Sequence, residues 1–244
     1  MTGFFAGKRY WIIGASAGIG AALARELHRR RASLILSARD AGALQALAAD
    51  CGDATVLPLD LGQRDTLVRA VASLAESKVD GVICTAALYD PARVAELDAA
   101  RSEDLVRVNL LGSLDVARLC PPLIAAGGQL VLFGSVAGYF GLPNGQAYSA
   151  TKAAIINLAE SLRTELAPAI DVRLVSPGFV KTRLTDKNSF AMPALITPEQ
   201  AAIAVANGLQ RRSFEIHFPK RFTLGIKLLR ALPYAASLRL VARL

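Results

Sequence analysis

Cysteine and histidine are scarce in this chain of 244 residues, and their scarcity argues against several classes of protein. The three cysteines, Cys51, Cys84 and Cys120, are far apart, odd in number and form no CxxC pair. This spacing does not suit a disulfide framework and favours a reducing, cytoplasmic compartment. His28 and His217 are too few for a histidine metal site without a cysteine cluster. We therefore expect no metal, and both histidine side chains exposed.

Long apolar runs are also missing. No stretch of 18 or more uncharged apolar residues predicts a transmembrane helix. The start, MTGFFAGKRYWIIGAS, lacks the uninterrupted apolar core and cleavage site of a secretory signal. Hydrophobic residues nevertheless make up 53% of the chain. They suffice to bury both faces of a sheet, and the length suits one α/β domain.

Acidic residues are almost absent from the end of the chain. From Arg211 onward there are eight lysines and arginines but one acid, Glu215, so this segment holds +7 of the net charge of +8. The rest of the chain is nearly neutral, and the high pI therefore gives no reason to expect nucleic-acid binding. We divide the chain into a domain over residues 1–218 and a basic tail over 219–244.

Short β-type runs alternate with longer helical patterns through the domain. Alternation of this kind is typical of βαβ units, and continuously apolar strands indicate a sheet covered on both faces. The sequence thus predicts a three-layer α/β fold, a doubly wound parallel β-sheet (Rossmann fold) with about seven strands and helices on both faces. The predicted strands are 9–14, 33–38, 55–59, 80–85, 129–135, 171–176 and 214–218, and the predicted helices are 18–31, 41–50, 63–77, 101–120, 147–167 and 198–211.

Glycines cluster between the first predicted strand and the first predicted helix, in GASAGIG at 14–20. Gly14, Gly18 and Gly20 permit a tight turn, close approach of the backbone to a pyrophosphate, and close helix packing. The N-terminus of the helix supplies free N–H groups and partial positive charge for the anion. This placement predicts nucleotide binding.

The end of the second predicted strand, LILSARD, indicates which nucleotide. Sites for NAD usually hold the ribose 2′-hydroxyl with an acid there, whereas an arginine suits a 2′-phosphate. Ser37 and Ala38 take the place of the acid and Arg39 follows, while Asp40 fits a helix cap. The sequence predicts NADP(H), with Ser16 as a second phosphate neighbour. The alternative is that Arg39 is a solvated surface residue.

A tyrosine and a lysine lie four residues apart in YSATKAA at 148–154, which places them on one face of a helix. A nearby cation favours phenolate, so we expect Lys152 to lower the pKa of Tyr148 from about 10 toward working pH. Taken alone, the pair also fits two half-buried side chains with solvated tips. The other motifs decide between these interpretations.

The order of these motifs resembles that of the short-chain dehydrogenase/reductase family, up to about residue 218. The motifs that carry the resemblance are GxxxGxG at 14–20, Asp60 in LPLDL, Asn109 in VRVNLLG, Ser135 thirteen residues before Tyr148, YxxxK at 148–152, and PGFVKT at 177–182. The catalytic residues expected on this basis are Asn109, Ser135, Tyr148 and Lys152. The residues expected at the cofactor are Gly14, Ser16, Gly18, Ile19, Gly20, Arg39, Asp60, Leu61, Ala86, Tyr148, Lys152, Pro177, Gly178, Val180 and Thr182.

The resemblance implies hydride transfer between the nicotinamide of NADP(H) and a carbonyl or secondary alcohol. Tyr148 is expected to donate the proton to the carbonyl oxygen and Ser135 to hydrogen-bond that oxygen. The resemblance also implies that Lys152 grips the nicotinamide ribose, and that Asn109 distorts its helix so that a water links its carbonyl to the lysine. The alternative is a cofactor-binding scaffold or redox sensor with little turnover.

Residues 84–87 depart from the family pattern, because they read Cys-Thr-Ala-Ala where the family commonly has Asn-Asn-Ala-Gly. Ala87 replaces a glycine whose bare backbone lets the cofactor approach, so packing on the adenosine side is expected to differ. The segment 179–197 lies where the family places a mobile substrate lid. It is rich in apolar residues, as is VAGYFGLP at 136–143. These segments favour a small apolar carbonyl or alcohol as the substrate.

The basic tail should form two short helices separated by Pro233. Two alternatives stay open for it: peripheral contact with an anionic membrane, or packing on a neighbouring subunit or over the substrate site. The resemblance implies a homodimer or homotetramer. The cations expected on one side of each helix are Lys227 and Arg230, then Arg239 and Arg243, opposite the apolar Phe222, Ile226 and Leu229, then Leu238 and Val241.

Overall fold

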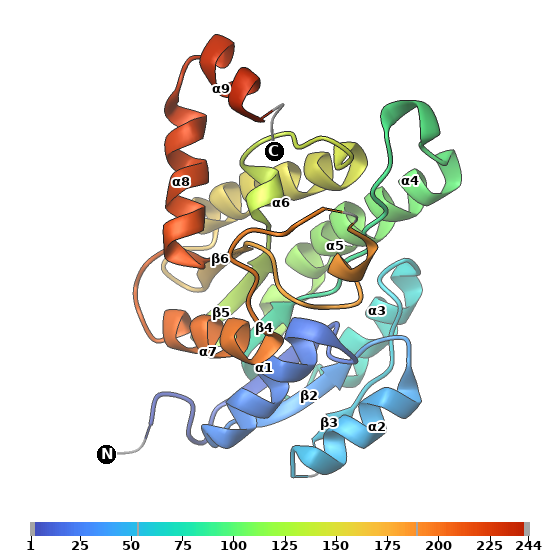
Figure 1. Ribbon diagram of the computed structural model, residues 1–244. Coiled ribbons are helices and arrows are strands. Elements are labelled where there is room, and N and C mark those ends of the chain that lie inside the picture. Colours follow the sequence, from blue (N-terminus) through green and yellow to red (C-terminus); the bar gives the residue numbers. More distant parts are fainter. Residues whose placement is uncertain (1–2, 53, 189, 242–244) are drawn as a thin grey trace.

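The computed structural model describes residues 3–52, 54–188 and 190–241 (Figure 1). Its centre is one sheet of seven parallel strands in the order β3-β2-β1-β4-β5-β6-β7. The strands are β1 (Arg9–Ile13), β2 (Ser33–Ser37), β3 (Thr55–Val56), β4 (Val79–Cys84), β5 (Ile124–Phe133), β6 (Asp171–Pro177) and β7 (Glu215–Phe218). The strand order reverses between β1 and β4, and ligands of such sheets bind at this switch point.

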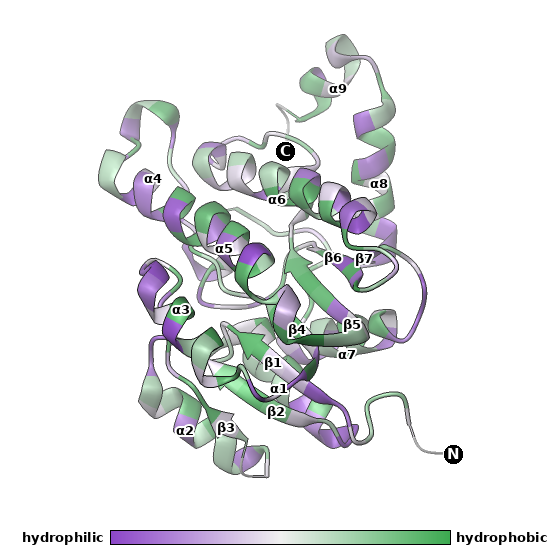
Figure 2. Cartoon of the chain, turned by 180° about the vertical axis from the view of Figure 1, so that it is seen from behind, coloured by the Kyte–Doolittle hydropathy of each residue, from purple (hydrophilic) through white to green (hydrophobic). Residues whose placement is uncertain are grey.

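Helices cover both faces of the sheet, which confirms the predicted fold class. Alternate strand residues face opposite layers, so Ile12 packs with Leu23 of α1 while Ile13 packs in the layer of Val116 and Ile155. Figure 2 shows the apolar strands in green between these layers. One layer holds α1 (Gly18–Arg29), α2 (Ala41–Asp50) and α7 (Pro198–Leu209), and the other holds α3 (Arg64–Ser73), α5 (Gly112–Leu119) and α6 (Gln146–Glu165).

The predicted helix 101–120 is wrong in one respect, because it is not a single α-helix. It consists of α4 (Ala99–Leu105), a π-helical segment, η2 (Val106–Leu111), and α5. Asp98 caps its start by accepting a hydrogen bond from the backbone N–H of Arg101 at 2.9 Å. The resemblance implied a distortion of this helix at Asn109 but not its π-helical form, because hydrophobic spacing does not distinguish i→i+5 from i→i+4 hydrogen bonding.

The tail forms α8 (Lys220–Ala231) and α9 (Tyr234–Val241), which lie on either side of Pro233 as predicted. Phe222 and Ile226 of α8 pack with Val136 and Tyr139, which follow β5. Helix α8 therefore packs on the body of the same chain, and this contact does not decide between the two alternatives left open for the tail. Arg243 lies outside the described residues.

The predicted basic side of α8 faces this contact. Lys227 forms an ion pair with Glu215, and Arg230 donates to the backbone carbonyl of Tyr139. His217, expected to be exposed, is partly covered and shares a hydrogen bond with Thr223 of α8. Within the described part of the chain, no helix is long and apolar enough to cross a bilayer.

Candidate functional site

Two adjoining cavities open where the strands end, at the switch point between β1 and β4. The glycine-turn cavity, of about 730 Å³, is lined by the turn after β1, by the ends of β2 and β3, and by residues 85–88 after β4. The tyrosine cavity, of about 170 Å³, is lined by Ser135, Tyr148 and Lys152 together with residues 177–180, Thr182, Leu184, Thr185, Asn188 and Phe190. Ile19, Thr85 and Thr182 line both cavities, so a ligand could extend from one into the other.

The glycine turn has the backbone geometry that the sequence predicted. Gly14 and Gly18 have φ angles of +96° and +56°, a region that side chains rarely allow. A Cβ on Gly14 would lie 2.5 Å from the backbone nitrogen of Ala86, so only a glycine fits there. Helix α1 begins at Gly18, and the residue before it, Ala17, supplies no capping side chain. The first amides of α1 are therefore suited to bind an anion.

Arg39 lines the glycine-turn cavity, and its side chain is exposed. Ser37 does not reach the cavity, because its hydroxyl is buried, donates to the carbonyl of Leu57 and accepts from Trp11 Nε1. Asp40 caps α2 by accepting from the N–H of Ala43 at 2.9 Å, as predicted. Arg39 is thus the residue of LILSARD that combines access to the cavity with positive charge.

The remaining residues expected at the cofactor divide between the two cavities. Ser16, Asp60, Leu61 and Ala86 line the glycine-turn cavity with Gly14, Gly18 and Gly20, whereas Pro177, Gly178 and Val180 line the tyrosine cavity. Size and chemistry both fit a dinucleotide. A volume of about 730 Å³ falls in the range of about 300–1,000 Å³ typical of ligand sites, and Arg39 and Arg183 supply cations to the cavity that the start of α1 also lines.

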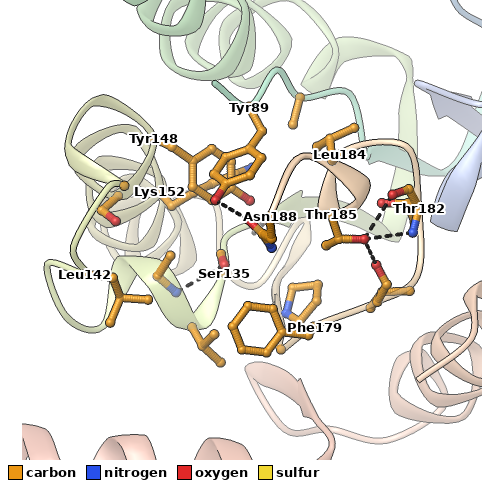
Figure 3. A pocket seen from close by; sticks show the side chains of 18 of the residues that line it. Tyr89, Ser135, Leu142, Tyr148, Lys152, Phe179, Thr182, Leu184, Thr185 and Asn188 are labelled. Carbon is orange, nitrogen blue, oxygen red and sulfur yellow. Dashed lines mark hydrogen bonds between the residues drawn. The ribbon is translucent and has the colours of Figure 1, made fainter. Parts of the chain in front are cut away.

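Ser135, Tyr148 and Lys152 converge in the tyrosine cavity from two elements (Figure 3). Ser135 follows β5 and starts the 3-10 turn η4 (Val136–Gly138), where its Oγ accepts from the N–H of Ala137 at 3.1 Å. Tyr148 and Lys152 occupy successive turns of α6. The Nζ of Lys152 donates to the carbonyl of Phe133 at 2.7 Å and lies 5.6 Å from the centre of the Tyr148 ring.

The pKa of Tyr148 moves opposite to the sequence-based expectation. Burial raises the pKa of Tyr148 to about 12, hydrogen bonding with Ser135 opposes this rise, and the nearby Tyr89 adds to it. Burial also lowers the pKa of Lys152 to about 8. The expected lowering of the tyrosine pKa by Lys152 does not appear, because the low polarity around both side chains disfavours both charges.

Asn109 lies behind the wall of the site, not in either cavity. Its buried side chain accepts from the N–H of Leu88 at 2.7 Å and donates to the Leu88 carbonyl at 2.9 Å and to Thr151 Oγ1 at 3.3 Å. Its backbone carbonyl accepts from Ser113 Oγ at 2.6 Å. Asn109 thus fastens the loop after β4 to α6. The π-helical segment that contains it is the helix distortion that the resemblance implied.

Thr85, in the stretch that departs from the family pattern, hydrogen-bonds locally. Its hydroxyl is within hydrogen-bond distance of two carbonyls, those of Ile13 at 3.1 Å and Gly14 at 3.0 Å. The end of β4 is thereby tied to the glycine turn. Ala87 lines both cavities, so its methyl group lies where a bound ligand would pass. The predicted change in adenosine packing stays a prediction.

Tyr89 and Asn188 are residues of the site that the sequence analysis did not name. Tyr89 packs edge-on against Tyr148, and its hydroxyl donates to Asn188 Oδ1 at 2.7 Å. Asn188 belongs to the expected lid segment 179–197, of which Ser189 lies outside the described residues. The one available signal was the position of Tyr89 shortly after the fourth strand, at the ligand-binding end of the sheet.

Comparison with known proteins agrees with this geometry. Residues 8–192 match the profile of a family described as short chain dehydrogenase. An uncharacterized oxidoreductase from Myxococcus xanthus (strain DK1622) is 32% identical over 231 residues, which cover 91% of each chain.

Two solved structures are similar over most of the chain. A short chain dehydrogenase from Burkholderia cenocepacia J2315, in complex with NADP, has a TM-score of 0.85 and 26% identity over 97% of this chain and 98% of that chain. A short-chain dehydrogenase from Sphingobium yanoikuyae, in complex with NADPH, has a TM-score of 0.79 and 28% identity over 87% of this chain and 88% of that chain.

Proposed function

The chain belongs to the short-chain dehydrogenase family of oxidoreductases, and we propose that it is an NADP(H)-dependent enzyme that interconverts a carbonyl and a secondary alcohol. The observation that carries this proposal is the meeting of Ser135, Tyr148 and Lys152 in one cavity that adjoins the glycine turn. Each residue has a separate task there. The alternative, a scaffold with little turnover, gives no reason for this convergence.

The bound nicotinamide would supply the hydride in the reductive direction. With a pKa of about 12, Tyr148 keeps its proton at neutral pH and can donate it to the carbonyl oxygen. The Ser135 hydroxyl would hold the same oxygen and polarise the bond. Lys152, fixed by the Phe133 carbonyl, would bind the ribose hydroxyls and support the phenolate left after proton transfer. Asn109 would hold the loop after β4 in place.

The choice of NADP(H) rests on Arg39, which would pair with the 2′-phosphate, with Ser16 as a second neighbour. The amides at the start of α1 would bind the pyrophosphate, and Asp60 would contact adenine. The similar proteins from Burkholderia cenocepacia and Sphingobium yanoikuyae were solved with NADP and NADPH.

An apolar substrate suits the tyrosine cavity. Leu142, Phe179, Leu184 and Phe190 line its walls, and Figure 3 shows Leu142, Phe179 and Leu184 around the reactive hydroxyls. Such side chains exclude water and favour a substrate that carries little polar surface apart from its carbonyl. We propose a small apolar ketone or secondary alcohol.

A homodimer or homotetramer is also part of the proposal. The helix formed by α4, η2 and α5 leaves Val106, Leu111 and Leu114 exposed by 40–47%, so an apolar strip is free to pair. Sedimentation velocity would test this; a monomer at micromolar concentration would contradict it.

The decisive experiment measures oxidation of NADPH and of NADH against a panel of apolar ketones, and the reverse reaction with the matching alcohols. We expect turnover with NADPH and a much lower kcat/KM with NADH. A protein that binds NADPH tightly but turns over neither panel would support the scaffold alternative instead.

A further inference from the structure

A groove of about 530 Å³ lies between the start of α6 and the two C-terminal helices, and we call it the tail groove. It adjoins the tyrosine cavity, because Ala137, Leu142, Pro143 and Ser149 line both spaces. The tail groove therefore lies next to the space in which the substrate carbonyl would lie. Its other walls are formed by residues 138–141, Gln146, Ala150, Ala153, Arg230, Leu238 and Val241.

Small side chains on α6 leave this space open. Ala150 and Ala153 are three residues apart, so they lie on one helix face, and both line the groove. Opposite them, Leu238 and Val241 of α9 supply apolar surface. The lining is thus mostly carbon, as expected for a site that holds an apolar chain.

The position of the C-terminal helices over the groove is fixed by polar contacts. Glu215 accepts hydrogen bonds from Ser176 Oγ at 2.7 Å, from the Tyr139 hydroxyl and from Lys227 Nζ. Arg230 donates to the Tyr139 carbonyl. These contacts hold α8 against the segment that follows Ser135. The outer wall of the groove is therefore fixed relative to the proposed catalytic residues.

Ser149 marks the junction between the groove and the tyrosine cavity. Its side chain is only 5% exposed, and among the described residues its Oγ has no hydrogen-bond partner. Buried hydroxyls are nearly always paired, since an unpaired one is unfavourable. Because Ser149 lines both spaces, a ligand that extends from one into the other would pass this residue.

We propose that the tail groove is the second half of the substrate site and receives the distal end of an elongated apolar substrate, whose carbonyl lies at Tyr148. The chain would pass Ser149 and lie between Ala150 and Leu238. This inference rests on the proposed function and adds the substrate class to it, an extended aliphatic ketone or alcohol.

The test compares kcat/KM for straight-chain ketones from butan-2-one to decan-2-one with NADPH. We expect kcat/KM to rise with chain length in the wild-type enzyme. Ala150→Leu and Leu238→Trp should fill the groove and lower kcat/KM for decan-2-one at least tenfold, with that for butan-2-one changed less than twofold. Leu228→Trp is the control, because Leu228 is 70% exposed on α8 and lines none of the three spaces.

Calorimetric binding of butan-2-ol and decan-2-ol to the NADPH-loaded variants separates the two proposals. The proposal that the groove holds the substrate chain is refuted if both filling variants keep the chain-length preference. It is also refuted if the wild type shows no such preference, even if the wild type reduces ketones. Another outcome is a protein that shows no turnover but binds decan-2-ol more tightly than butan-2-ol, with both filling variants abolishing this preference. That result supports the groove as a binding site and refutes only the proposed reaction. If Leu238→Trp loses self-association and keeps the wild-type dependence of kcat/KM on chain length, the groove binds a second copy of this chain and not the substrate.

Discussion

The ring of Tyr89 lies edge-on against the ring of Tyr148, with 4.8 Å between their centroids and 71° between their planes. The same tyrosine holds the opposite side of the cavity, since its hydroxyl donates to Asn188 and its carbonyl accepts from Lys187 Nζ at 2.7 Å. The proposed proton donor is thus packed against the residue that fastens the segment over the substrate.

Tyr89→Phe should loosen this fastening while leaving the ring contact in place. Losing one hydrogen bond is worth roughly 0.5–1.5 kcal/mol, so we expect KM for an apolar ketone to rise about two- to tenfold with kcat nearly unchanged. Hydrogen exchange at residues 185–188 should become faster. Tyr89→Leu, which also removes the ring, should lower kcat as well. Unchanged exchange and KM in Tyr89→Phe would show that the contact does not hold the lid.

Tyr148→Phe should keep the fold and NADPH binding yet lose nearly all turnover, because only the hydroxyl that donates the proton is removed. Circular dichroism and NADPH fluorescence serve as controls for folding and binding. A variant that retains more than a tenth of the wild-type rate on a true substrate would remove Tyr148 from the proposed role.

Ala38→Asp combined with Arg39→Asp should shift the cofactor preference from NADPH to NADH. The change removes a charged hydrogen bond, worth about 1.5–3 kcal/mol, and adds repulsion against the 2′-phosphate. Binding titrations of both cofactors measure the shift, and Arg69→Asp, at a residue that lines neither cavity, controls for the charge reversal at Arg39. Equal weakening of both cofactors would show that Arg39 does not bind the 2′-phosphate.

Acid should destabilise the attachment of α8. Burial by itself raises the pKa of Glu215, but hydrogen bonds from Lys227, Tyr139 and Ser176 outweigh burial and hold it below its usual range. A carboxyl with a lowered folded-state pKa stabilises the fold above its unfolded pKa of about 4.3, and this contribution is lost as pH falls through the folded value.

We therefore expect Glu215→Gln to lower Tm at neutral pH, and the difference from wild type to shrink as pH falls below about 4. Thermal unfolding followed by circular dichroism across this range measures both. Because Asp171 and Glu26 also have lowered pKa values, the difference between the two proteins is the informative quantity. A constant difference across the range would contradict the account.

Contact of the tail with anionic membranes remains a prediction. The apolar residues of α8 that are exposed for such a contact differ from those that the sequence predicted. Ile226 packs inward, whereas Leu224 and Leu228 are 54% and 70% exposed beside the exposed Lys220 and Arg221. We expect co-sedimentation with phosphatidylglycerol vesicles at low salt, weakened at high salt and by Leu224→Ser with Leu228→Ser. Val94→Ser, at a site that is 72% exposed, is the control. Absence of binding at low salt would remove the hypothesis.

The sequence was sufficient to predict which residues meet at the site where their positions follow from the strand order. Ser135 follows β5 and Tyr148 lies in the first turn of α6, so a parallel sheet brings them to the same edge. Contacts between remote loops could not be predicted in this way. Tyr89 and Asn188 are 99 positions apart and lie in segments without periodicity.

Burial decided the electrostatic questions that the sequence left open. The spacing of Tyr148 and Lys152 on one helix face was predicted, but the direction of the tyrosine pKa depends on how much protein covers the pair. Glu215 entered the sequence analysis only as one charge in a count. Its role appears once β7 is seen beside α8, with three donors around one carboxylate.

The π-helical segment at Asn109 determines how far α5 is rotated about the helix axis relative to α4. Each π-type hydrogen bond spans one residue more than an α-type bond, so α5 is turned relative to the path a regular helix would follow from α4. Val116 can therefore meet the sheet while Asn109 meets the Leu88 backbone. A residue inserted into or deleted from this stretch would rotate α5 away from the sheet or Asn109 away from Leu88. The length of the stretch therefore matters more for the wall behind the proposed site than the identity of its exposed side chains.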